Sequence, residues 1–529
     1  MATRSQTAAV LLAGALALAA CGSGGSGKSG GGPTAQAGGG RTLVIDTSFD
    51  LKTADPGRTY EPTGLIVGKA AYETLLTFDG SDVTKPVPAL ADSYKLSADG
   101  KVLTLTLKKG ATFADGSPVT ADDVVFSLTR VRDMKGTPSF LLDGVEVAKT
   151  DDSTVTLTSK QANPALPYIL PNPALGILNS KLAKAHGATA DAQDKAEQYL
   201  NGSSAGSGPY EIESFNVSSQ VVLKANGKYY GPKPFYDKVV IRNVEAATQK
   251  LNVQRGDSQV ALNLSGDQVT GMPANLQVKK TASANVIFLL VNQDSGVSRT
   301  TPNPKFVEAV RKGVDYAGLL ELAGEGATQA PGVIPSQLLG ALGADQAAKR
   351  DVEGAKAALA ASGVSNPTVK LEYPSELTVN GLSFQPLAER IQANLKEVGI
   401  TVDLQPAPVT TALDNYRNGK EEMGLWYWGP DYPDPSDYLV FLPGKTVGLR
   451  AGWKAGADRT VSTAGDKAAA AVGEDARKQA YAEMQTQLNA TGPFVPLIQP
   501  SQNIVTAASV AGLEYHPVWT VDVADLTGK

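Results

Sequence analysis

The segment between residues 369 and 404 constrains the fold most, because it predicts a strand, a helix and a second strand in close succession. Strand-forming residues run over 369–373 and again over 400–404. Between them, apolar residues recur at every fourth position and give a helix one apolar face. These residues are Leu387, Ile391 and Leu395. Gly399 is suited to end that helix, which starts near Phe384. The sequence therefore predicts a βαβ unit in a mainly parallel α/β lobe.

A second region, residues 101–158, predicts antiparallel β-structure instead. The run 101–107 alternates polar and apolar residues, so that its leucines share one face of a strand, and 154–158 repeats the pattern. Between these runs, Thr120 precedes a helical pattern and Asp123 follows three residues later, as in a capping box. The first half of the chain is therefore expected to combine antiparallel strands with short helices.

The N-terminus indicates where the protein is located. Arg4 is followed by an apolar run over residues 8–20, which is shorter than the roughly 20 residues of a membrane-spanning helix and has the length of a signal-peptide core. The run ends in Leu-Ala-Ala-Cys at residues 18–21, which resembles the lipobox of bacterial lipoproteins, and Cys21 is the only cysteine. We therefore expect a signal peptide over 1–20, a lipid on Cys21, and a flexible Gly- and Ser-rich tether over 21–40.

Composition and charge exclude several classes of function. The 529 residues suffice for two or three domains. A formal net charge of −5, without any Lys- or Arg-rich run, argues against a nucleic-acid partner. Two histidines and one cysteine leave little for a Ser-His-acid triad or a zinc site. The segment around Ser204 matches a nucleophile elbow, but its predicted helix and strand come in the reverse order. We expect no enzyme, no cofactor and no metal site.

The segment 425–432 is a candidate binding wall. It predicts a strand that runs into a Gly-Pro turn, and on an extended backbone Trp426 and Trp428 share one face. Two indoles followed by the carboxylate of Asp431 suit a cationic amphipathic ligand. The same residues are also compatible with an aromatic core strand whose turn places Asp431 in solvent.

Several segments resemble the peptide/nickel/opine class of extracytoplasmic solute-binding proteins, which includes the dipeptide- and oligopeptide-binding proteins. The most specific is 89–131, which contains Leu-Lys-Lys-Gly-Ala-Thr-Phe-Ala-Asp-Gly-Ser-Pro-Val-Thr-Ala-Asp-Asp-Val. The segments 206–210, 229–234 and 431–435 follow in the family's order. The resemblance covers nearly all of the chain after the tether.

This resemblance implies an α/β fold of two lobes that close as a class II periplasmic-binding-protein clamshell. Lobe one is expected over 41–286 and 497–529, with an extra antiparallel β-rich subdomain over 81–195. Lobe two is expected over 287–496. The ligand would lie in the cleft between the lobes.

The resemblance also implies which residues bind the ligand. Asp431 falls where peptide-binding members place the carboxylate that holds the ligand's α-ammonium group, and Trp428 falls on a neighbouring cleft tryptophan. Trp426, Tyr432 and Tyr72 are weaker candidates, the last because it resembles a cleft-lining segment of lobe one. The residue that would meet a ligand carboxylate is not identified by the sequence.

The function implied is that of the lipid-anchored, monomeric binding component of an ABC importer on the extracytoplasmic face of a bacterial cell membrane. It would capture short peptides and deliver them to permease and ATPase subunits. A carrier of oligosaccharides or metal chelates and a ligand-sensing surface receptor remain alternatives. Stacked indoles suit a sugar ring too, whereas Asp431 favours a cationic terminus.

Overall fold

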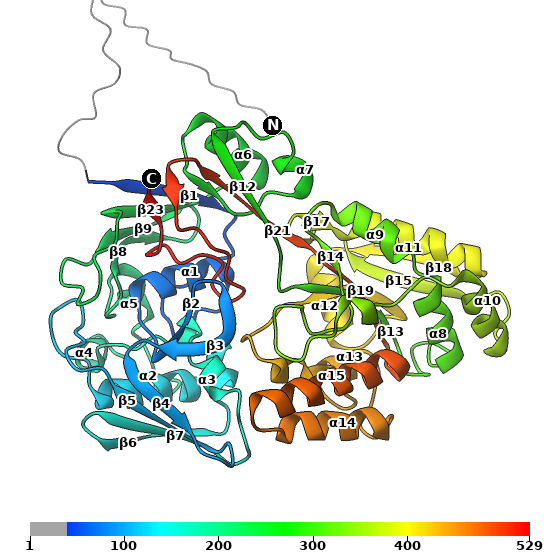
Figure 1. Cartoon of the computed structure of the whole chain (residues 1–529), viewed down its shortest axis with the longest axis horizontal. Coiled ribbons are helices and arrows are strands. Elements are labelled where there is room, and N and C mark those ends of the chain that lie inside the picture. The colour runs from blue at the N-terminus through cyan, green and yellow to red at the C-terminus, as the bar shows by residue number, and fades with distance from the viewer. Residues whose placement is uncertain (1–39) are drawn as a thin grey trace, which may run out of the picture. The chain divides into compact units, whose positions relative to one another are not determined.

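The computed structural model describes residues 40–529, whose three largest sheets have seven, six and four strands (Figure 1). The predictions for the signal peptide, for lipidated Cys21 and for nearly all of the tether lie outside the described residues. We call the part built on the seven-stranded and four-stranded sheets lobe one, and the part built on the six-stranded sheet lobe two.

The seven-stranded sheet has the order β12-β21-β11-β1-β10-β9-β8 and includes the C-terminal strand β21. Strand β1 pairs in parallel with β10 and β11, and the other pairings are antiparallel. Its strands are β1 (Thr42–Thr47), β8 (Tyr210–Asn216), β9 (Gln220–Ala225), β10 (Lys238–Asn243), β11 (Val260–Ala261), β12 (Leu276–Ala282) and β21 (Ser501–Ala507). The helices of lobe one are α1 (Pro62–Ala71), α2 (Ala121–Asp133), α3 (Leu166–Ile169), α4 (Ser180–Ala185), α5 (Glu197–Gly202), α6 (Ala246–Arg255) and α7 (Gly266–Val269).

The antiparallel β-rich subdomain predicted for lobe one is present as the four-stranded sheet β4-β5-β7-β6. Its strands are β4 (Ala91–Leu96), β5 (Val102–Leu107), β6 (Val145–Asp151) and β7 (Thr154–Ser159). The alternating leucines of β5 are buried, and β5 pairs directly with β7, as their shared pattern predicts. Helix α2 starts with the predicted capping box, in which Thr120 and Asp123 each bond to the other's backbone N–H.

The six-stranded sheet of lobe two has the order β14-β20-β13-β19-β15-β18. Its strands are β13 (Val286–Val291), β14 (Thr328–Gln329), β15 (Thr368–Pro374), β18 (Thr401–Ala407), β19 (Met423–Trp428) and β20 (Phe494–Gln499). The helices are α8 (Pro304–Gly313), α9 (Tyr316–Ala323), α10 (Val352–Ala361), α11 (Phe384–Val398), α12 (Val409–Arg417), α13 (Thr446–Arg450), α14 (Arg459–Ala470) and α15 (Glu474–Thr491). Alternate residues of β13 pack into two different cores: Ile287 and Leu289 face α8 to α11, and Phe288 and Leu290 face α12 to α15.

The predicted βαβ unit is confirmed as β15-α11-β18. Strands β15 and β18 pair in parallel along their whole length, and α11 starts at Phe384. Its apolar face is fully buried, and Gly399 ends the helix in the left-handed conformation with a φ of 98°. Parallel pairing extends to β19, whereas β13, β14 and β20 are antiparallel to their neighbours, so the lobe is less parallel than predicted.

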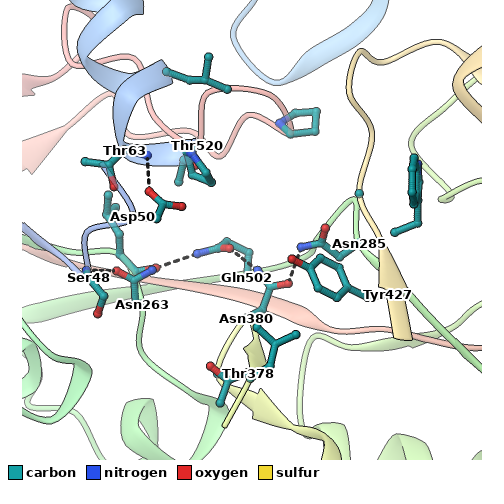
Figure 2. A pocket seen from close by; sticks show the side chains of 18 of the residues that line it. Ser48, Asp50, Thr63, Asn263, Asn285, Thr378, Asn380, Tyr427, Gln502 and Thr520 are labelled. Atoms are coloured by element: carbon teal, nitrogen blue, oxygen red, sulfur yellow. Dashed lines mark hydrogen bonds between the residues drawn. The ribbon is translucent and has the colours of Figure 1, made fainter. Parts of the chain in front are cut away.

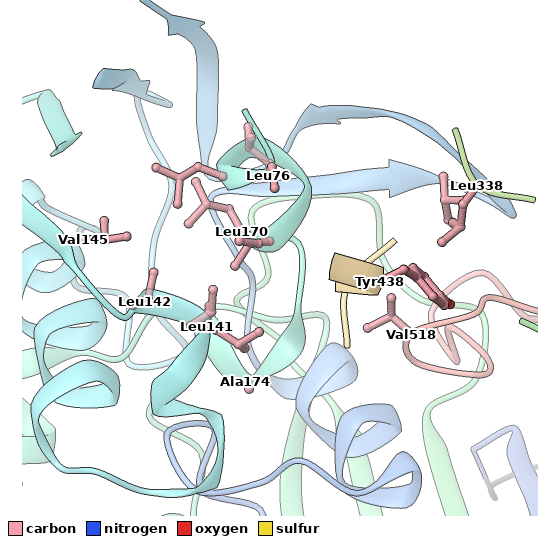
Figure 3. Packing of buried hydrophobic residues seen from close by; sticks show 14 of the residues in the cluster. Leu76, Leu141, Leu142, Val145, Leu170, Ala174, Leu338, Tyr438 and Val518 are labelled. Carbon is pink, nitrogen blue, oxygen red and sulfur yellow. The ribbon is translucent and has the colours of Figure 1, made fainter. Parts of the chain in front are cut away.

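The chain passes from lobe one to lobe two between β12 and β13 and returns between β20 and β21. Each crossing is short, at residues 283–285 and at Pro500. Apolar side chains of the two lobes also share one buried cluster, in which Leu338 and Tyr438 of lobe two lie near Val518 of the C-terminal segment (Figure 3). The same cluster includes Leu76 and Leu170 of lobe one. The lobes are thus in contact away from the crossings.

A buried ion network joins α2 to the rest of lobe one. The guanidinium of Arg130, which is 0% exposed, donates two hydrogen bonds to Asp55 at 2.6–2.7 Å and two to Asp194 at 2.7–2.9 Å. Burial alone would raise the pKa of Asp194, but hydrogen bonds and attraction to Arg130 lower it to about 2. The pKa of an aspartate in the unfolded chain is about 3.9. The stabilisation that Asp194 contributes is therefore present at neutral pH and is lost as the pH falls from about 4 to about 2.

Replacement of Arg130 by methionine tests this network. The change removes the fully buried cation from Asp55 and Asp194 and leaves them only the partly exposed Arg58, so we expect the free energy of unfolding to fall by about 3 kcal/mol. Arg132→Met is the matched control, because Arg132 lies on the same helix but is half-exposed in its pair with Asp133, and we expect a loss of about 1 kcal/mol or less. Urea denaturation at pH 7 measures both. Equal losses of unfolding free energy in the two variants would contradict the stabilising role of the Arg130 network.

Candidate binding cavity between the lobes

A cavity of about 890 Å³ is lined by residues of both lobes. This volume lies within the range of about 300–1,000 Å³ that is typical of small-molecule sites. The polar and aromatic lining includes Ser48, Asp50, Tyr60, Asn172 and Asn263 from lobe one, Asn285, Asn380, Tyr416, Arg417, Trp426, Tyr427, Trp428, Asp431 and Arg450 from lobe two, and Gln502 and Thr520 from the C-terminal return. A solute in this cavity would contact both lobes at once.

The tryptophans of β19 face this cavity from lobe two, on the face that the alternation predicts. Trp426 and Trp428 pack against one apolar cluster, and Leu425 and Tyr427 pack against the other. Trp426 is only 3% exposed, stacks on Tyr416 at 4.4 Å between ring centroids, and donates its indole N–H to the buried carboxyl of Glu421. Trp426 therefore supports the wall, whereas half-buried Trp428 presents its ring to the cavity.

Asp431 lies just past the end of β19, where the two lobes meet. Tyr60 of lobe one donates its hydroxyl to Oδ1 of Asp431 at 2.6 Å, and Asn172 of lobe one donates its amide to the carbonyl oxygen of Asp431 at 3.1 Å. On the side of lobe two, the backbone N–H of Asp431 and the indole N–H of Trp428 both donate to Oδ2 of Asp437, at 3.1 and 3.2 Å. Asp431 is therefore held from both lobes while it lines the cavity.

The two carboxyls, Asp431 and Asp437, form an electrostatically coupled pair. Burial raises the pKa of Asp437 well above its ordinary value, and the neighbouring charge of Asp431 adds to this effect. Burial also raises the pKa of Asp431, although the hydrogen bond from Tyr60 opposes the rise. Each carboxyl therefore makes ionisation of the other less favourable.

The pair formed by Asp431 and Asp437 has no basic ion-pair partner within residues 40–529. Neither Asp431 nor Asp437 forms a salt bridge with Lys, Arg or His there, and burial is the largest influence on the pKa of each carboxyl. The contrast is Asp434, three residues further along the turn, which pairs with buried Arg477 at 2.6 Å. Asp431 thus offers an unneutralised carboxylate to whatever fills the cavity.

A belt of neutral amide side chains also lines the cavity (Figure 2). Asn285 donates to Asn380 at 3.0 Å, and Asn380 donates to Gln502 at 2.5 Å. Asn263 accepts hydrogen bonds from the backbone N–H of Ser48 and from the hydroxyl of Thr47. Uncharged donors and acceptors of this kind suit the amide groups of a ligand backbone or the hydroxyls of a sugar.

The remaining candidates from the sequence lie elsewhere. Tyr432 is not among the cavity-lining residues: it packs against the shared apolar cluster, with its hydroxyl 3.4 Å from that of Ser436. Tyr72 is 1% exposed and lies in the core of lobe one, close behind Gly176 and Gly206, so its side chain has no access to the cavity. Cys21 lies outside the described residues.

Other side chains of the site were not identified from the sequence. Tyr60 and Asn172 reach Asp431 across 371 and 259 residues of chain, and no motif marks either position. No motif marks Asp437 either, although it follows Asp431 by only six residues.

The described residues add two findings. Nowhere within residues 40–529 do three or more His, Cys, Asp or Glu side chains gather so as to hold a metal ion. Over the same range, no helix has both the length and the apolar character needed to cross a bilayer.

The comparisons with known proteins agree with the sequence resemblance. A family model described as bacterial extracellular solute-binding proteins, family 5 Middle, matches residues 85–448. A probable D,D-dipeptide-binding periplasmic protein of Escherichia coli, DdpA, is 28% identical over 486 residues and aligns over 90% of this chain and 92% of its own. Di/tripeptide-binding protein 2 of Pseudomonas aeruginosa is 26% identical, over 90% of this chain and 93% of its own.

Solved structures share the fold. The ABC transporter substrate-binding protein CtaP of Listeria monocytogenes matches with a TM-score of 0.81 at 19% identity, over 92% of this chain and 99% of its own. The ABC transporter-associated periplasmic binding protein DppA of Helicobacter pylori, in complex with the peptide STSA, matches with a TM-score of 0.74 at 22% identity. The match covers 92% of this chain and 98% of the DppA chain. The predicted two-lobed class II architecture is thus confirmed.

Proposed function

The chain belongs to family 5 of the bacterial extracellular solute-binding proteins, and on that premise we propose that it captures short peptides between its lobes for an ABC importer. It is a solute-binding protein and not an enzyme. The peptide ligand is supported by the names of two curated relatives, a probable D,D-dipeptide-binding protein and a di/tripeptide-binding protein. Permease and ATPase subunits would be its partners, and the binding protein itself would act as a monomer.

The observation that carries the proposal is the unneutralised carboxylate of Asp431 in the cavity wall. An α-amine has an ordinary pKa of about 7.7–8.0 and is mostly protonated at neutral pH. Such an ammonium group would bring a positive charge to the carboxyl of Asp431, beside the hydroxyl of Tyr60. A neutral sugar would leave that charge unmatched, which favours the peptide over the oligosaccharide alternative.

The rest of the cavity suits the constant parts of a peptide. The amide belt can meet backbone N–H and C=O groups, and Trp428 offers an apolar face to a side chain. A cavity of about 890 Å³ leaves room for side chains of different size. Affinity would therefore come from the charged terminus and the backbone, with little dependence on peptide sequence.

We propose that the short crossings at residues 283–285 and at Pro500 act as hinges, close to the lobe boundaries expected at 286/287 and 496/497. Since Asp431 belongs to lobe two and Tyr60 and Asn172 belong to lobe one, opening at these hinges would separate the contacts that surround Asp431. A bound ammonium group would favour the closed state, which a permease can distinguish from the open one.

Calorimetry with peptides that differ only in their α-amine tests this function. A set of unmodified dipeptides and tripeptides is expected to bind, and the same peptides N-acetylated are expected to bind more weakly by about 2–5 kcal/mol, because acetylation leaves the charge of Asp431 unpaired. Asp431→Asn should weaken the binding of the unmodified peptides by a similar amount and the binding of the acetylated peptides much less.

Asp466→Asn is the matched control, because this exposed carboxylate on α14 lies away from the cavity and its removal changes the net charge equally. It should bind both peptide sets as the natural protein does. Equal affinity of the natural protein for free and acetylated peptides would refute the proposal, as would tight binding of oligosaccharides in place of peptides.

We further propose that Cys21 carries a lipid that anchors the protein to the outer face of the cell membrane. The support is the Leu-Ala-Ala-Cys sequence after an apolar run, together with the absence of any other cysteine in the chain. The tether over residues 22–40 would then allow the lobes to reach a permease in the same membrane.

Replacement of Cys21 by alanine tests the anchor. The variant cannot accept a lipid, so we expect it to move from the membrane fraction to the soluble extracytoplasmic fraction or the medium, as measured by immunoblotting. Ser23→Ala, two residues further along the tether, should remain with the membrane. An unchanged distribution of the Cys21→Ala protein would rule the lipid anchor out.

A further inference from the structure

His516 is a buried histidine in the C-terminal return to lobe one, and the proposed function does not use it. It is 2% exposed, and the chain has only one other histidine, His186. Its Nδ1 accepts a hydrogen bond from the backbone N–H of Val518 at 3.1 Å, whereas its buried Nε2 has no hydrogen-bond partner within residues 40–529. An imidazole nitrogen accepts a hydrogen bond only when it carries no proton. The contact therefore requires the neutral tautomer with its proton on Nε2.

This hydrogen bond lies inside a tight loop over residues 516–520. His516 and Thr520 exchange two backbone hydrogen bonds, at 3.0 and 2.9 Å, around the three residues between them. Thr520 has a φ of 61°, a left-handed conformation that is rare for a β-branched residue and persists only where neighbouring contacts impose it. Nδ1 of His516 supplies such a contact, because it holds the backbone N–H of Val518 within the loop. The imidazole thus helps to set the shape of the loop.

Aromatic packing holds the imidazole ring against the loop. The ring stacks on the indole of Trp519 at 3.4 Å between ring centroids, with an angle of 1° between the ring planes. The ring of Phe78, in β2 (Leu76–Asp79), lies 5.5 Å away. Because both contacts come from buried side chains, the plane of the imidazole is fixed where Nδ1 reaches the residue before Trp519.

The loop that His516 shapes is part of the cavity wall. Residues 517, 518 and 520 line the cavity, whereas His516 itself does not. Val518 also belongs to the apolar cluster that the lobes share, near Leu338 and Tyr438 of lobe two (Figure 3). A change in the shape of the loop would therefore affect both the ligand site and the contact between the lobes.

Protonation of His516 would act against this arrangement. A proton on Nδ1 would face the N–H of Val518 and replace their hydrogen bond by a contact between two donors. Burial lowers the pKa of His516 well below its ordinary value, and the positive charge of Lys69 on α1 lowers it further. The neutral form is therefore the one that fits this structure.

Lys69 belongs to a group of charged side chains beside the loop. The others are acids, namely Asp79 at the end of β2, and Glu514, Asp522 and Asp525 of the C-terminal segment. Asp522 pairs with Lys69 at 3.4 Å. Burial, together with the charge of Asp522, raises the pKa of Asp525 to about 6, so Asp525 titrates in the same pH range as a histidine. Substitution of His516 alone leaves these groups in place and separates its titration from theirs.

We propose that His516 is a positioning residue for peptide binding: as a neutral acceptor it holds the 516–520 loop in the shape that the loaded cavity needs, and its protonation weakens binding. This inference rests on the proposed function and adds a residue that does not touch the ligand. Opening of the lobes would remove Leu338 and Tyr438 from Val518 and free the loop, so the imidazole would accept a proton more readily in the open state. Proton and peptide then compete, and each lowers the affinity for the other by the same factor.

The affinity for peptides at two pH values tests this inference. Calorimetry on the full chain compares the natural protein with His516→Asn at pH 7.5 and 5.5, with unmodified dipeptides and tripeptides. Asparagine places Oδ1 as many bonds from Cα as Nδ1, so it can accept the N–H of Val518, but it does not titrate. Between the two pH values the natural protein should lose about 3- to 10-fold more affinity than His516→Asn. One histidine with an ordinary pKa of about 6.5 changes affinity by at most about tenfold per pH unit.

Two further variants separate the hydrogen bond from packing and from the loss of a histidine. His516→Phe keeps a ring against Trp519 but leaves the N–H of Val518 without an acceptor, so it should bind peptides about 10-fold more weakly at pH 7.5. At that pH His516→Asn should bind nearly as tightly as the natural protein. His186→Asn removes the other histidine, which is exposed and does not line the cavity, and it should keep the natural affinity and pH dependence.

Nitrogen-15 NMR of histidine-labelled full chain supplies a readout that does not depend on affinity. The two histidine signals are assigned by the loss of one of them in His516→Asn. At pH 7.5 His516 should carry its proton on Nε2 and none on Nδ1. Saturating peptide should shift the titration of His516 to lower pH, as the competition between proton and peptide requires.

Three results would overturn the inference while peptide binding leaves the proposed function intact. They are a proton on Nδ1 of His516 at pH 7.5, an equal pH-dependent loss of affinity in the natural protein and His516→Asn, and equal weakening by His516→Asn and His516→Phe at pH 7.5. If no peptide binds at either pH, the proposed function fails and the effect of His516 on binding fails with it. The NMR measurement then still shows whether His516 holds the loop as a neutral acceptor.

Discussion

The contact between Tyr60 and Asp431 is the interaction on which the cavity depends, because it joins the two lobes through a buried carboxyl. A buried carboxylate is costly unless hydrogen bonds or an opposite charge meet it. The structure supplies hydrogen bonds from lobe one, through Tyr60, and holds the backbone of Asp431 from both sides, through Asn172 and Asp437. It does not supply the opposite charge. A solute that brings a cation would supply it under the proposed function.

The sheet of lobe two and the side chains packed on it hold the residues around Asp431 in place. Strand β19 lies between β13 and β15; its start pairs with both strands, and its end at Trp428 pairs with Val286 of β13. Trp426 is locked by Tyr416 and Glu421 behind the wall, which leaves Trp428 as the indole that can contact a ligand. The guanidinium of Arg450 lies over the rings of Tyr416 and Trp428 in the same wall. Rigid support reduces the entropy lost when a ligand binds.

Sequence patterns predicted the local parts of this structure and missed the long-range ones. The β15-α11-β18 unit, the capping box at Thr120 and the shared face of Trp426 and Trp428 depend on neighbours within a few turns of chain, and periodicity reveals them. The partners of Asp431 are set by the packing of two lobes, which no local pattern encodes, so Tyr60 and Asn172 were not found. For the same reason a tyrosine in a familiar segment, Tyr72, was taken as cleft-lining although it packs beneath two glycines in the core.

The most direct test of the central claim is a crystal structure of the protein with a bound peptide whose α-amine is free. The measurement is the distance from the α-nitrogen to the nearer carboxylate oxygen of Asp431. The account predicts about 2.7–3.2 Å, the range of an N–H···O hydrogen bond, with Tyr60 still at the same carboxylate. A peptide seated in the cavity with its α-nitrogen in solvent, or against a different acidic side chain, would contradict it.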